Sequence, residues 1–208
     1  MTDTVVVVDY GMGNLHSVHK ALVRVGALVQ VSSDPKVVAG ADRLVVPGVG
    51  AFGDAMQQLR SLGLVEPIRR HIHSGRPFFG ICLGLQILFD VGYEDGEHTG
   101  LGMLAGNVVR FPDALTREKG LKIPHMGWNQ LEVVRPEPVL AGIPNGTYVY
   151  FVHSYYPVPA NQKVVATRTD YGGPFTSAVA INNIFAVQFH PEKSQAVGLR
   201  ILQNFLRL

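Results

Sequence analysis

The chain has 208 residues, of which 47% are hydrophobic and 16% are charged, and its formal net charge is +2. This composition is typical of a globular protein with a substantial core, and it excludes a disordered or fibrous chain. The small net charge, without any cluster of Lys and Arg, argues against nucleic acid as a partner. The charged fraction is below the usual value of about 25%, which indicates that part of the surface faces a partner instead of water.

The cysteine count and the first ten residues predict the compartment. A single cysteine, Cys82, excludes an internal disulfide and fits a reducing cytosol. The opening MTDTVVVVDY has no basic segment, and its apolar run is too short for a signal peptide or a membrane span. We therefore expect a cytoplasmic protein that does not contact a membrane.

The first half of the chain predicts strands that alternate with helices. Residues 4–8 form an unbroken β-branched run, which is typical of a buried strand. Further strands are expected at 27–31, 43–46 and 77–81, and helices at 15–25, 52–60 and 64–73. This order predicts an α/β fold with a mostly parallel sheet covered by helices. The loop after the first expected strand, at residues 9–14, has two glycines but lacks the third glycine of a dinucleotide-binding motif. No dinucleotide is therefore expected there.

The second half has a different character. Residues 92–106 and 113–120 are expected to be loops, and residues 123–129 are too irregular for the interior of an element. Strands are expected at 107–111, 130–134, 147–152, 163–168, 177–181 and 184–189, and a closing helix at 194–206. We therefore expect an antiparallel, strand-rich addition to the sheet.

Cys82 lies between an apolar strand-like run and a helix-like run at 83–89, with Gly80 and Gly84 two residues away on either side. This spacing is that of the G-x-nucleophile-x-G elbow, with sulfur in place of a hydroxyl group. In such a turn the flanking side chains would collide, and glycine tolerates the unusual backbone angles. The turn would expose the sulfur at a helix N-terminus, which favours the thiolate. On these residues alone, a buried hydrophobic cysteine fits equally well.

A cysteine nucleophile needs a base, such as a histidine. One ring nitrogen of that histidine faces the nucleophile, and the other needs a hydrogen-bond acceptor. His190 and Glu192 follow a predicted strand and supply both groups. A His near a Glu is common in a chain with eight histidines, so the pairing rests on both loops meeting at one edge of the sheet. Residues 47–50 contain two glycines, and this loop is either a plain turn or a source of free N–H groups.

Three motifs together resemble the class I (triad) glutamine amidotransferases: PGVG at 47–50, GICLGLQ at 80–86 and FHPEKS at 189–194. Four longer segments are similar to the glutaminase subunits of imidazole glycerol phosphate synthase, an enzyme of histidine biosynthesis: DYGMGNLHSV at 9–18, PGVGAFGDAM at 47–56, IPHMGWN at 123–129 and YFVHSYY at 150–156. The resemblance covers nearly the whole chain, so we expect one glutamine amidotransferase domain over residues 1–208.

The resemblance implies a role for each catalytic group. Cys82 would be the nucleophile, His190 the base and acid, and Glu192 the orienting carboxylate. Glutamine would be hydrolysed to glutamate and ammonia through a γ-glutamyl thioester. The oxyanion donors would be the N–H of Leu83 and the loop around Val49 and Gly50, which would have to reorient before it donates.

The resemblance also implies substrate and partner contacts. Gln86 would bind the substrate glutamine, and the segment His153, Ser154 and Tyr155 would hold its amino-acid end, with no metal or cofactor. The partner would be a (β/α)8-barrel cyclase that forms a heterodimer with the chain and receives the ammonia. The expected interface residues are Asn14, Trp128 and Lys193.

Three other functions remain open. The chain could serve another synthase, such as an anthranilate or pyridoxal phosphate synthase, although the subfamily loops argue against this. It could be a non-catalytic regulatory subunit of the same fold, although Cys82, His190 and Glu192 are all present. It could be a thiol hydrolase that acts on peptides. The only Trp, Trp128, fits a core or an interface, and the surrounding loop chemistry favours the surface.

Overall fold

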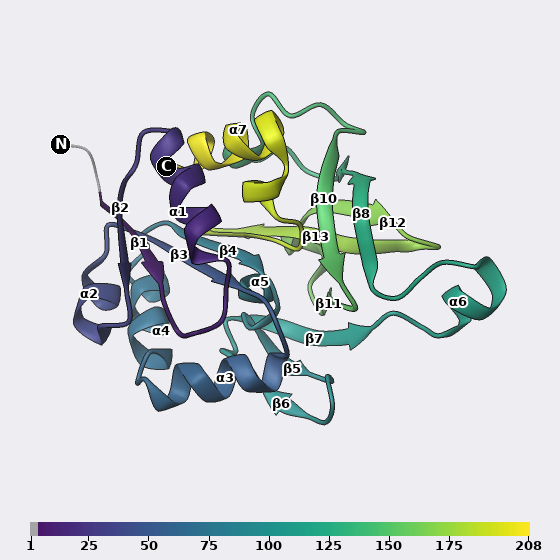
Figure 1. The fold of residues 1–208 in the computed structure, drawn as a ribbon, viewed down its shortest axis with the longest axis horizontal. Coiled ribbons are helices and arrows are strands. Elements are labelled where there is room, and N and C mark those ends of the chain that lie inside the picture. Colours follow the sequence, from purple (N-terminus) through teal and green to yellow (C-terminus); the bar gives the residue numbers. More distant parts are fainter. Residues whose placement is uncertain (1–3) are drawn as a thin grey trace.

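The computed structural model describes residues 4–208, and its centre is an eight-stranded sheet (Figure 1). The strands lie in the order β2-β1-β3-β4-β14-β13-β12-β9. The first five are parallel: β2 (Leu28–Ser32), β1 (Thr4–Val8), β3 (Arg43–Gly48), β4 (Phe78–Cys82) and β14 (Ile184–Val187). The predicted parallel sheet is confirmed, and its buried strands β3 and β4 are the unbroken apolar runs of the sequence.

The remaining strands confirm the predicted antiparallel addition. Three of them extend the central sheet: β13 (Pro174–Ile181), β12 (Val165–Asp170) and β9 (Glu132–Val133). A two-stranded sheet pairs β8 (His125–Gln130) with β10 (Tyr148–His153). A four-stranded sheet has the order β11 (Tyr155–Pro159), β7 (Leu104–Arg110), β5 (Phe89–Gly92) and β6 (His98–Thr99).

Helices cover both faces of the parallel part of the sheet (Figure 1). One face carries α1 (Leu15–Arg24) and α7 (Gln195–Phe205), and the other carries α3 (Phe52–Ser61) and α4 (Val65–His73), with α2 (Pro35–Gly40) packed on α4. The alternation of strand side chains divides the core in two. Val5 and Val7 of β1 pack with α1 and α7, whereas Val6 and Val8 pack with α3 and α4. None of the helices within residues 4–208 is long and apolar enough to cross a membrane.

Four local predictions were wrong. Residues 92–106 hold β6 and the start of β7 instead of a single loop, and residues 113–120 contain a short helix, α6 (Ala114–Lys119). The helix after Cys82 is only α5 (Leu83–Gln86), because the chain enters β5 at Phe89. Residues 125–130 form β8, so the segment expected to be irregular is largely a strand. Three short 3-10 helices complete the described chain: η1 (Pro138–Leu140), η2 (Gln162–Val164) and η3 (Pro191–Lys193).

Candidate active site

Cys82 ends β4 with a positive φ of 54°, and α5 begins at the next residue. A Cβ on Gly84 would lie 1.8 Å from the carbonyl oxygen of Val46, and one on Gly80 would lie 2.5 Å from the carbonyl oxygen of Gly84. The flanking side chains would therefore collide with backbone and not with each other, which corrects the sequence-based expectation. The unusual backbone angle also lies on Cys82 itself, because neither glycine has a positive φ. Such strain on a non-glycine residue is typical of a functional site.

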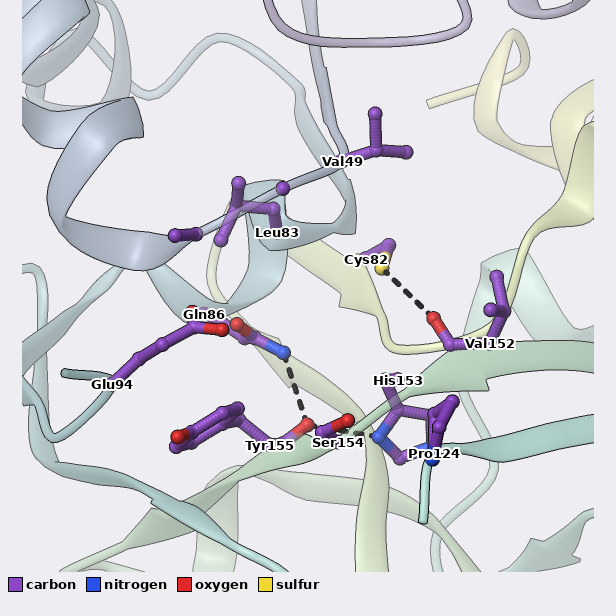
Figure 2. Close-up of a pocket in the computed structure, with 12 residues that line it drawn as sticks. Val49, Cys82, Leu83, Gln86, Glu94, Pro124, Val152, His153, Ser154 and Tyr155 are labelled. Carbon is purple, nitrogen blue, oxygen red and sulfur yellow. Dashed lines mark hydrogen bonds between the residues drawn. The ribbon is translucent and has the colours of Figure 1, made fainter.

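The sulfur opens into a cavity of about 410 Å³ (Figure 2). Cys82 is only 6% exposed, so it lies at the bottom of this cavity and not on the surface as the elbow motif had suggested. The cavity is lined by Val49, Gly50, Ala51, Cys82, Leu83, Gln86, Glu94, Pro124, Val152, His153, Ser154 and Tyr155. All the predicted oxyanion and substrate residues therefore border one cavity together with the predicted nucleophile.

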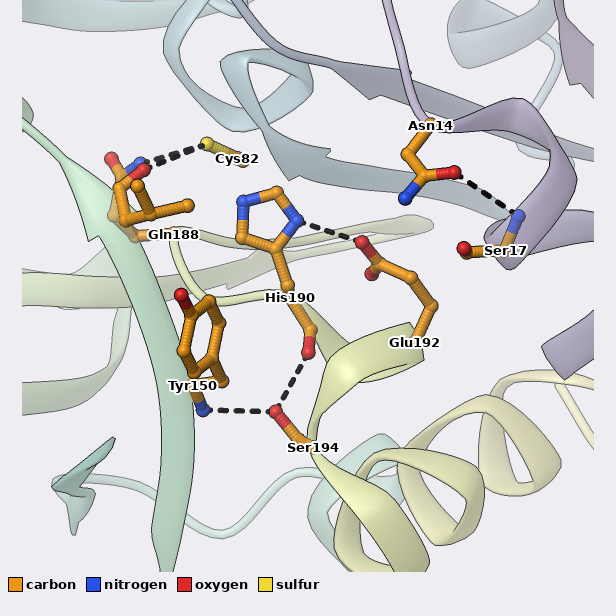
Figure 3. A network of polar contacts seen from close by, with 9 residues as sticks. Asn14, Ser17, Cys82, Tyr150, Gln188, His190, Glu192 and Ser194 are labelled. Atoms are coloured by element: carbon orange, nitrogen blue, oxygen red, sulfur yellow. Dashed lines mark hydrogen bonds and ion pairs between the residues drawn. The ribbon is translucent and has the colours of Figure 1, made fainter. Parts of the chain in front are cut away.

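His190 lies between Cys82 and Glu192 (Figure 3). Its Nδ1 is 2.7 Å from a carboxylate oxygen of Glu192, whose side chain is 1% exposed. Its Nε2 faces Cys82 and has no hydrogen-bond partner that meets normal geometry among the described residues. Burial alone would lower the pKa of His190, but the charge of the Cys82 sulfur, followed by Glu192, raises it above the ordinary value. The arrangement places an imidazole, held by a carboxylate, where it can exchange a proton with the sulfur.

The backbone around His190 is fixed by a neighbouring strand. The N–H of His190 donates to the carbonyl of Tyr150 in β10 (2.9 Å). Ser194 Oγ accepts from the N–H of Tyr150 (3.0 Å) and donates to the carbonyl of His190 (2.7 Å). Ser194 is fully buried, and sequence reasoning assigned it no role. The sequence pointed to Ser194 only through its position at the end of the FHPEKS motif.

Hydrogen bonds of the His153 ring, to the carbonyl of Tyr155 and to the ring of His125, hold the segment from His153 to Tyr155 in place. His153 Nδ1 lies 2.8 Å from the carbonyl of Tyr155, and its Nε2 lies 3.0 Å from Nδ1 of His125. Burial lowers the pKa of His153 to about 3 and that of His125 to about 4, so both rings are neutral. Both ring nitrogens of His153 are thereby used inside the protein, so His153 itself can offer a ligand only its backbone groups.

Gln86 and Glu94 face the same cavity (Figure 2). Gln86 Nε2 donates to the carbonyl of Tyr155 (3.0 Å) and to Gln188 Oε1 (3.1 Å), which leaves its own side-chain oxygen free for a ligand. Glu94 accepts from the N–H of Phe52 at 2.8 Å, and burial raises its pKa. It is the one carboxylate among the cavity residues, and no sequence pattern marked it.

The segment at residues 47–50 was expected to be a loop, but its first two residues end β3, and it is anchored there by a buried tyrosine. Tyr10 is 1% exposed, and its hydroxyl donates to the carbonyl of Pro47 at 2.8 Å. A Cβ on Gly48 would lie 2.2 Å from that hydroxyl, so only glycine fits beside it. Gly50 has a φ of 101°, which also favours glycine. The structure therefore holds the start of the loop firmly and leaves its exposed end, at Val49 and Gly50, beside Cys82.

The predicted interface residues lie outside the cavity. Trp128 of β8 is 45% exposed and meets the ring of Tyr150 edge-on, with centroids 6.1 Å apart. Lys193 Nζ lies 5.7 Å from the centroid of the same Tyr150 ring. We call Trp128, Tyr150 and Lys193 the aromatic–lysine cluster. Asn14 is exposed and caps α1 by accepting from the N–H of Ser17.

The comparisons with known proteins identify the class first. A model of the family "Glutamine amidotransferase class-I" matches residues 6–208, and the chain belongs to this family. The crystal structure of a glutamine amidotransferase (TM-score 0.74, 22% identity) covers 98% of this chain and 99% of its own. The structure of PurLQS from Thermotoga maritima (TM-score 0.72, 19% identity) covers 100% of this chain and 99% of its own. At these identities the two structures support the fold alone.

Closer relatives define the particular subfamily. The chain is 58% identical to the imidazole glycerol phosphate synthase subunit HisH of Syntrophotalea carbinolica, over 97% of this chain and 98% of the relative. It is 57% identical to the HisH protein of Aquifex aeolicus, over 97% of this chain and 95% of the relative. It therefore belongs to the HisH subunits of imidazole glycerol phosphate synthase.

Proposed function

We propose that Cys82, His190 and Glu192 hydrolyse the side-chain amide of glutamine, in a glutaminase subunit of imidazole glycerol phosphate synthase that serves histidine biosynthesis. The observation that carries this proposal is the geometry around His190. One ring nitrogen contacts a buried carboxylate at 2.7 Å and the other faces the sulfur at the bottom of the cavity. Membership of the glutamine amidotransferase family supports glutamine as the substrate.

The proposed reaction has two halves. The Cys82 sulfur attacks the amide carbon, and the carbonyl π electrons move to oxygen. The intermediate then expels ammonia, whose nitrogen takes a proton from His190, and a thioester remains. Water attacks the thioester as His190 accepts a proton, the carbon–sulfur bond breaks, and glutamate leaves. Glu192 holds Nδ1–H of His190 and stabilises the imidazolium during both halves.

The cavity offers complementary groups for the rest of the glutamine molecule. The Glu94 carboxylate has the charge to bind the α-ammonium group. The backbone N–H groups of residues 153–155 suit the α-carboxylate, and the free oxygen of Gln86 can accept from the substrate. These contacts would fix the amide at the sulfur, which is the main requirement for attack.

The oxyanion of the tetrahedral intermediate needs backbone donors, each of which is worth about 3–4 kcal/mol in comparable sites. The N–H of Leu83 follows the nucleophile directly, and the Val49–Gly50 end of the loop borders the same cavity. Tyr10 fixes the carbonyl of Pro47, so a reorientation of the loop would be confined to the residues after it. We infer that this loop donates only when a loaded partner is docked.

The partner is inferred to be a (β/α)8-barrel cyclase that forms a heterodimer with the chain. The HisH relatives are named as parts of a synthase, which supports the presence of a second protein. The aromatic–lysine cluster is a suitable docking surface, and neighbouring Met126 and Tyr148 are 62% and 55% exposed. Aromatic and Met side chains are enriched at interfaces. A sealed contact would also keep ammonia from being protonated in water before it reaches the cyclase.

Glutamine hydrolysis tests the proposal directly. Glutamate release is measured for the isolated chain, for its complex with the barrel partner, and for the complex with a nucleotide ligand of the partner. We expect low turnover alone and strong turnover in the loaded complex. High turnover in the isolated chain would refute gating by the partner. No turnover in any state, with no labelling of Cys82 by a glutamine-like electrophile, would refute the glutaminase assignment.

Trp128→Ala is expected to weaken the complex by about 2 kcal/mol, or roughly 30-fold in Kd, because a half-exposed Trp at an interface anchors its centre. The control is Leu62→Ala, which removes a side chain that is 40% exposed at the end of α3. Titration of the labelled partner measures both affinities. If both variants bind the partner as tightly as the parent chain, the aromatic–lysine cluster is not the docking surface.

A further inference from the structure

Gln188 is the buried polar residue closest to the chemistry that the proposed reaction does not use. It follows β14 directly, two residues before His190, and its side chain is fully buried. Its Nε2 lies 3.6 Å from the sulfur of Cys82, a normal length for an N–H···S hydrogen bond (Figure 3). Its backbone N–H donates to the carbonyl of Ser177 at 2.8 Å, so the residue is fixed at both ends.

The surrounding hydrogen bonds fix which end of the Gln188 amide faces the sulfur. The carbonyl of Tyr155 can only accept, so the atom of Gln86 that lies 3.0 Å from it must be the nitrogen. That same nitrogen lies 3.1 Å from Gln188, which must therefore present its oxygen to Gln86. The nitrogen of Gln188 is left to face the sulfur. The carbonyl of Tyr155 thus determines the orientation of both side-chain amides, that of Gln86 and that of Gln188.

The sulfur is better placed to accept a hydrogen bond than to donate one. The carbonyl that could accept its thiol proton, that of Val152, is 4.0 Å away, the far limit for sulfur. The Gln188 donor is 3.6 Å away, and the imidazole of His190 lies on another side of the sulfur (Figure 3). In a site that is 6% exposed, water contributes little to the solvation of a charged sulfur. The amide of Gln188 is a fixed replacement for that water.

We propose that Gln188 is a further catalytic residue, which donates a hydrogen bond to the anionic sulfur of Cys82 before attack and again when the sulfur leaves the thioester. In the first step the sulfur electron pair forms the bond to the amide carbon. In the last step the carbon–sulfur bond breaks and the pair returns to sulfur. The donor stabilises the sulfur only while it holds that pair, so Gln188 promotes both the resting thiolate and its departure. This inference rests on the proposed function for its role in turnover, but the contact itself does not.

Two variants of Gln188 test the inference. Gln188→Glu keeps the shape and an oxygen for Gln86 but replaces the donor that faces the sulfur, and Gln188→Met removes the amide. Gln57→Met, on the exposed face of α3, is the control. Cys82 is the only cysteine, so alkylation by iodoacetamide reports on this sulfur alone. At neutral pH we expect both Gln188 variants to react about tenfold more slowly than the parent chain. A tenfold change corresponds to about 1.4 kcal/mol.

Turnover provides the second measurement. In the loaded complex, rapid quenching with glutamine followed by mass spectrometry should show the thioester accumulating in the Gln188 variants, because the sulfur leaves more slowly. Unchanged alkylation and unchanged thioester levels, in variants with parental thermal unfolding, would overturn the inference and leave the glutaminase assignment intact. If the parent chain shows no glutamine turnover but the alkylation difference persists, the proposed function fails and the contact between Gln188 and the sulfur stands.

Discussion

Cys82→Ala is expected to abolish glutamine hydrolysis, with a loss of at least about 10⁴-fold in turnover, because no other group in the cavity can replace the sulfur nucleophile. Among the residues that line the cavity, Cys82 is the one thiol, and the hydroxyl groups are those of Ser154 and Tyr155. The folded chain should still bind its partner, because the aromatic–lysine cluster lies outside the cavity. The complex should therefore convert free ammonia at the parental rate.

The two rates separate the possible outcomes. Glutamate release from glutamine and product formation from ammonium salts are measured on the same preparation, with thermal unfolding as a check of the fold. Glutamine turnover within tenfold of the parent complex would show that Cys82 is not the nucleophile. Loss of both activities would indicate failed folding or docking instead.

Gly84→Ala is expected to destabilise the fold by at least about 3 kcal/mol or to prevent folding, because overpacking costs about 1–3 kcal/mol in general and here the added atom meets backbone. The added Cβ would lie 1.8 Å from the carbonyl oxygen of Val46, in the fully buried strand β3. No side chain can rotate away to relieve this contact, so either β3 or α5 must move. Any movement of α5 also displaces the N–H of Leu83 from the sulfur, and glutamine turnover should fall with stability.

Gly40→Ala is the matched control, since Gly40 is exposed, ends α2 and has no atom within 4 Å of an added Cβ. Its effect should lie between zero and a gain of about 1 kcal/mol, because Ala is the better helix former. Urea unfolding of both variants measures the difference in the free energy of unfolding. A Gly84→Ala protein within about 1 kcal/mol of the parent chain would mean that the elbow is looser than its geometry indicates.

The parallel sheet could be predicted because its inner strands β1, β3, β4 and β14 are buried and are written as mainly apolar runs, whereas the edge strand β2 is largely exposed. β8 could not, and the reason is physical. Its burial alternates as in a strand, but the buried His125 is polar while the exposed Met126 and Trp128 are apolar. The usual relation between polarity and burial is inverted, since His125 is satisfied by hydrogen bonds to His153 and Asn129. An apolar outer face is consistent with a strand that meets a partner.

The three residues that we propose as the triad could be named from the sequence because they lie in short motifs with a chemical meaning, and His190 lies between the other two. Gln188, Glu94 and Ser194 could not be assigned a role, because their positions depend on contacts between segments far apart in the sequence. Gln188 and His190 both lie after the end of β14, so the alternation of side chains along a strand does not place Gln188 beside the sulfur. Glu94 reaches the cavity from an irregular loop after β5, where no strand rule applies either.

The order in which the ribosome makes the strands differs from their order in the sheet. β4 carries the thiol, and its neighbour in the sheet is β14, in which Ile184 pairs with Phe78. At usual rates of synthesis, β14 is made about 5–20 s after β4. A nascent chain that ends before β14 therefore holds a thiol without its base. It also leaves one edge of β4 open, in the apolar centre of the future sheet, where unpaired strands aggregate. In the complete chain, the backbone of His190 is bound to Tyr150 of β10 and to Ser194. The last segment to be made therefore supplies both the proposed base, His190, and Lys193 of the aromatic–lysine cluster.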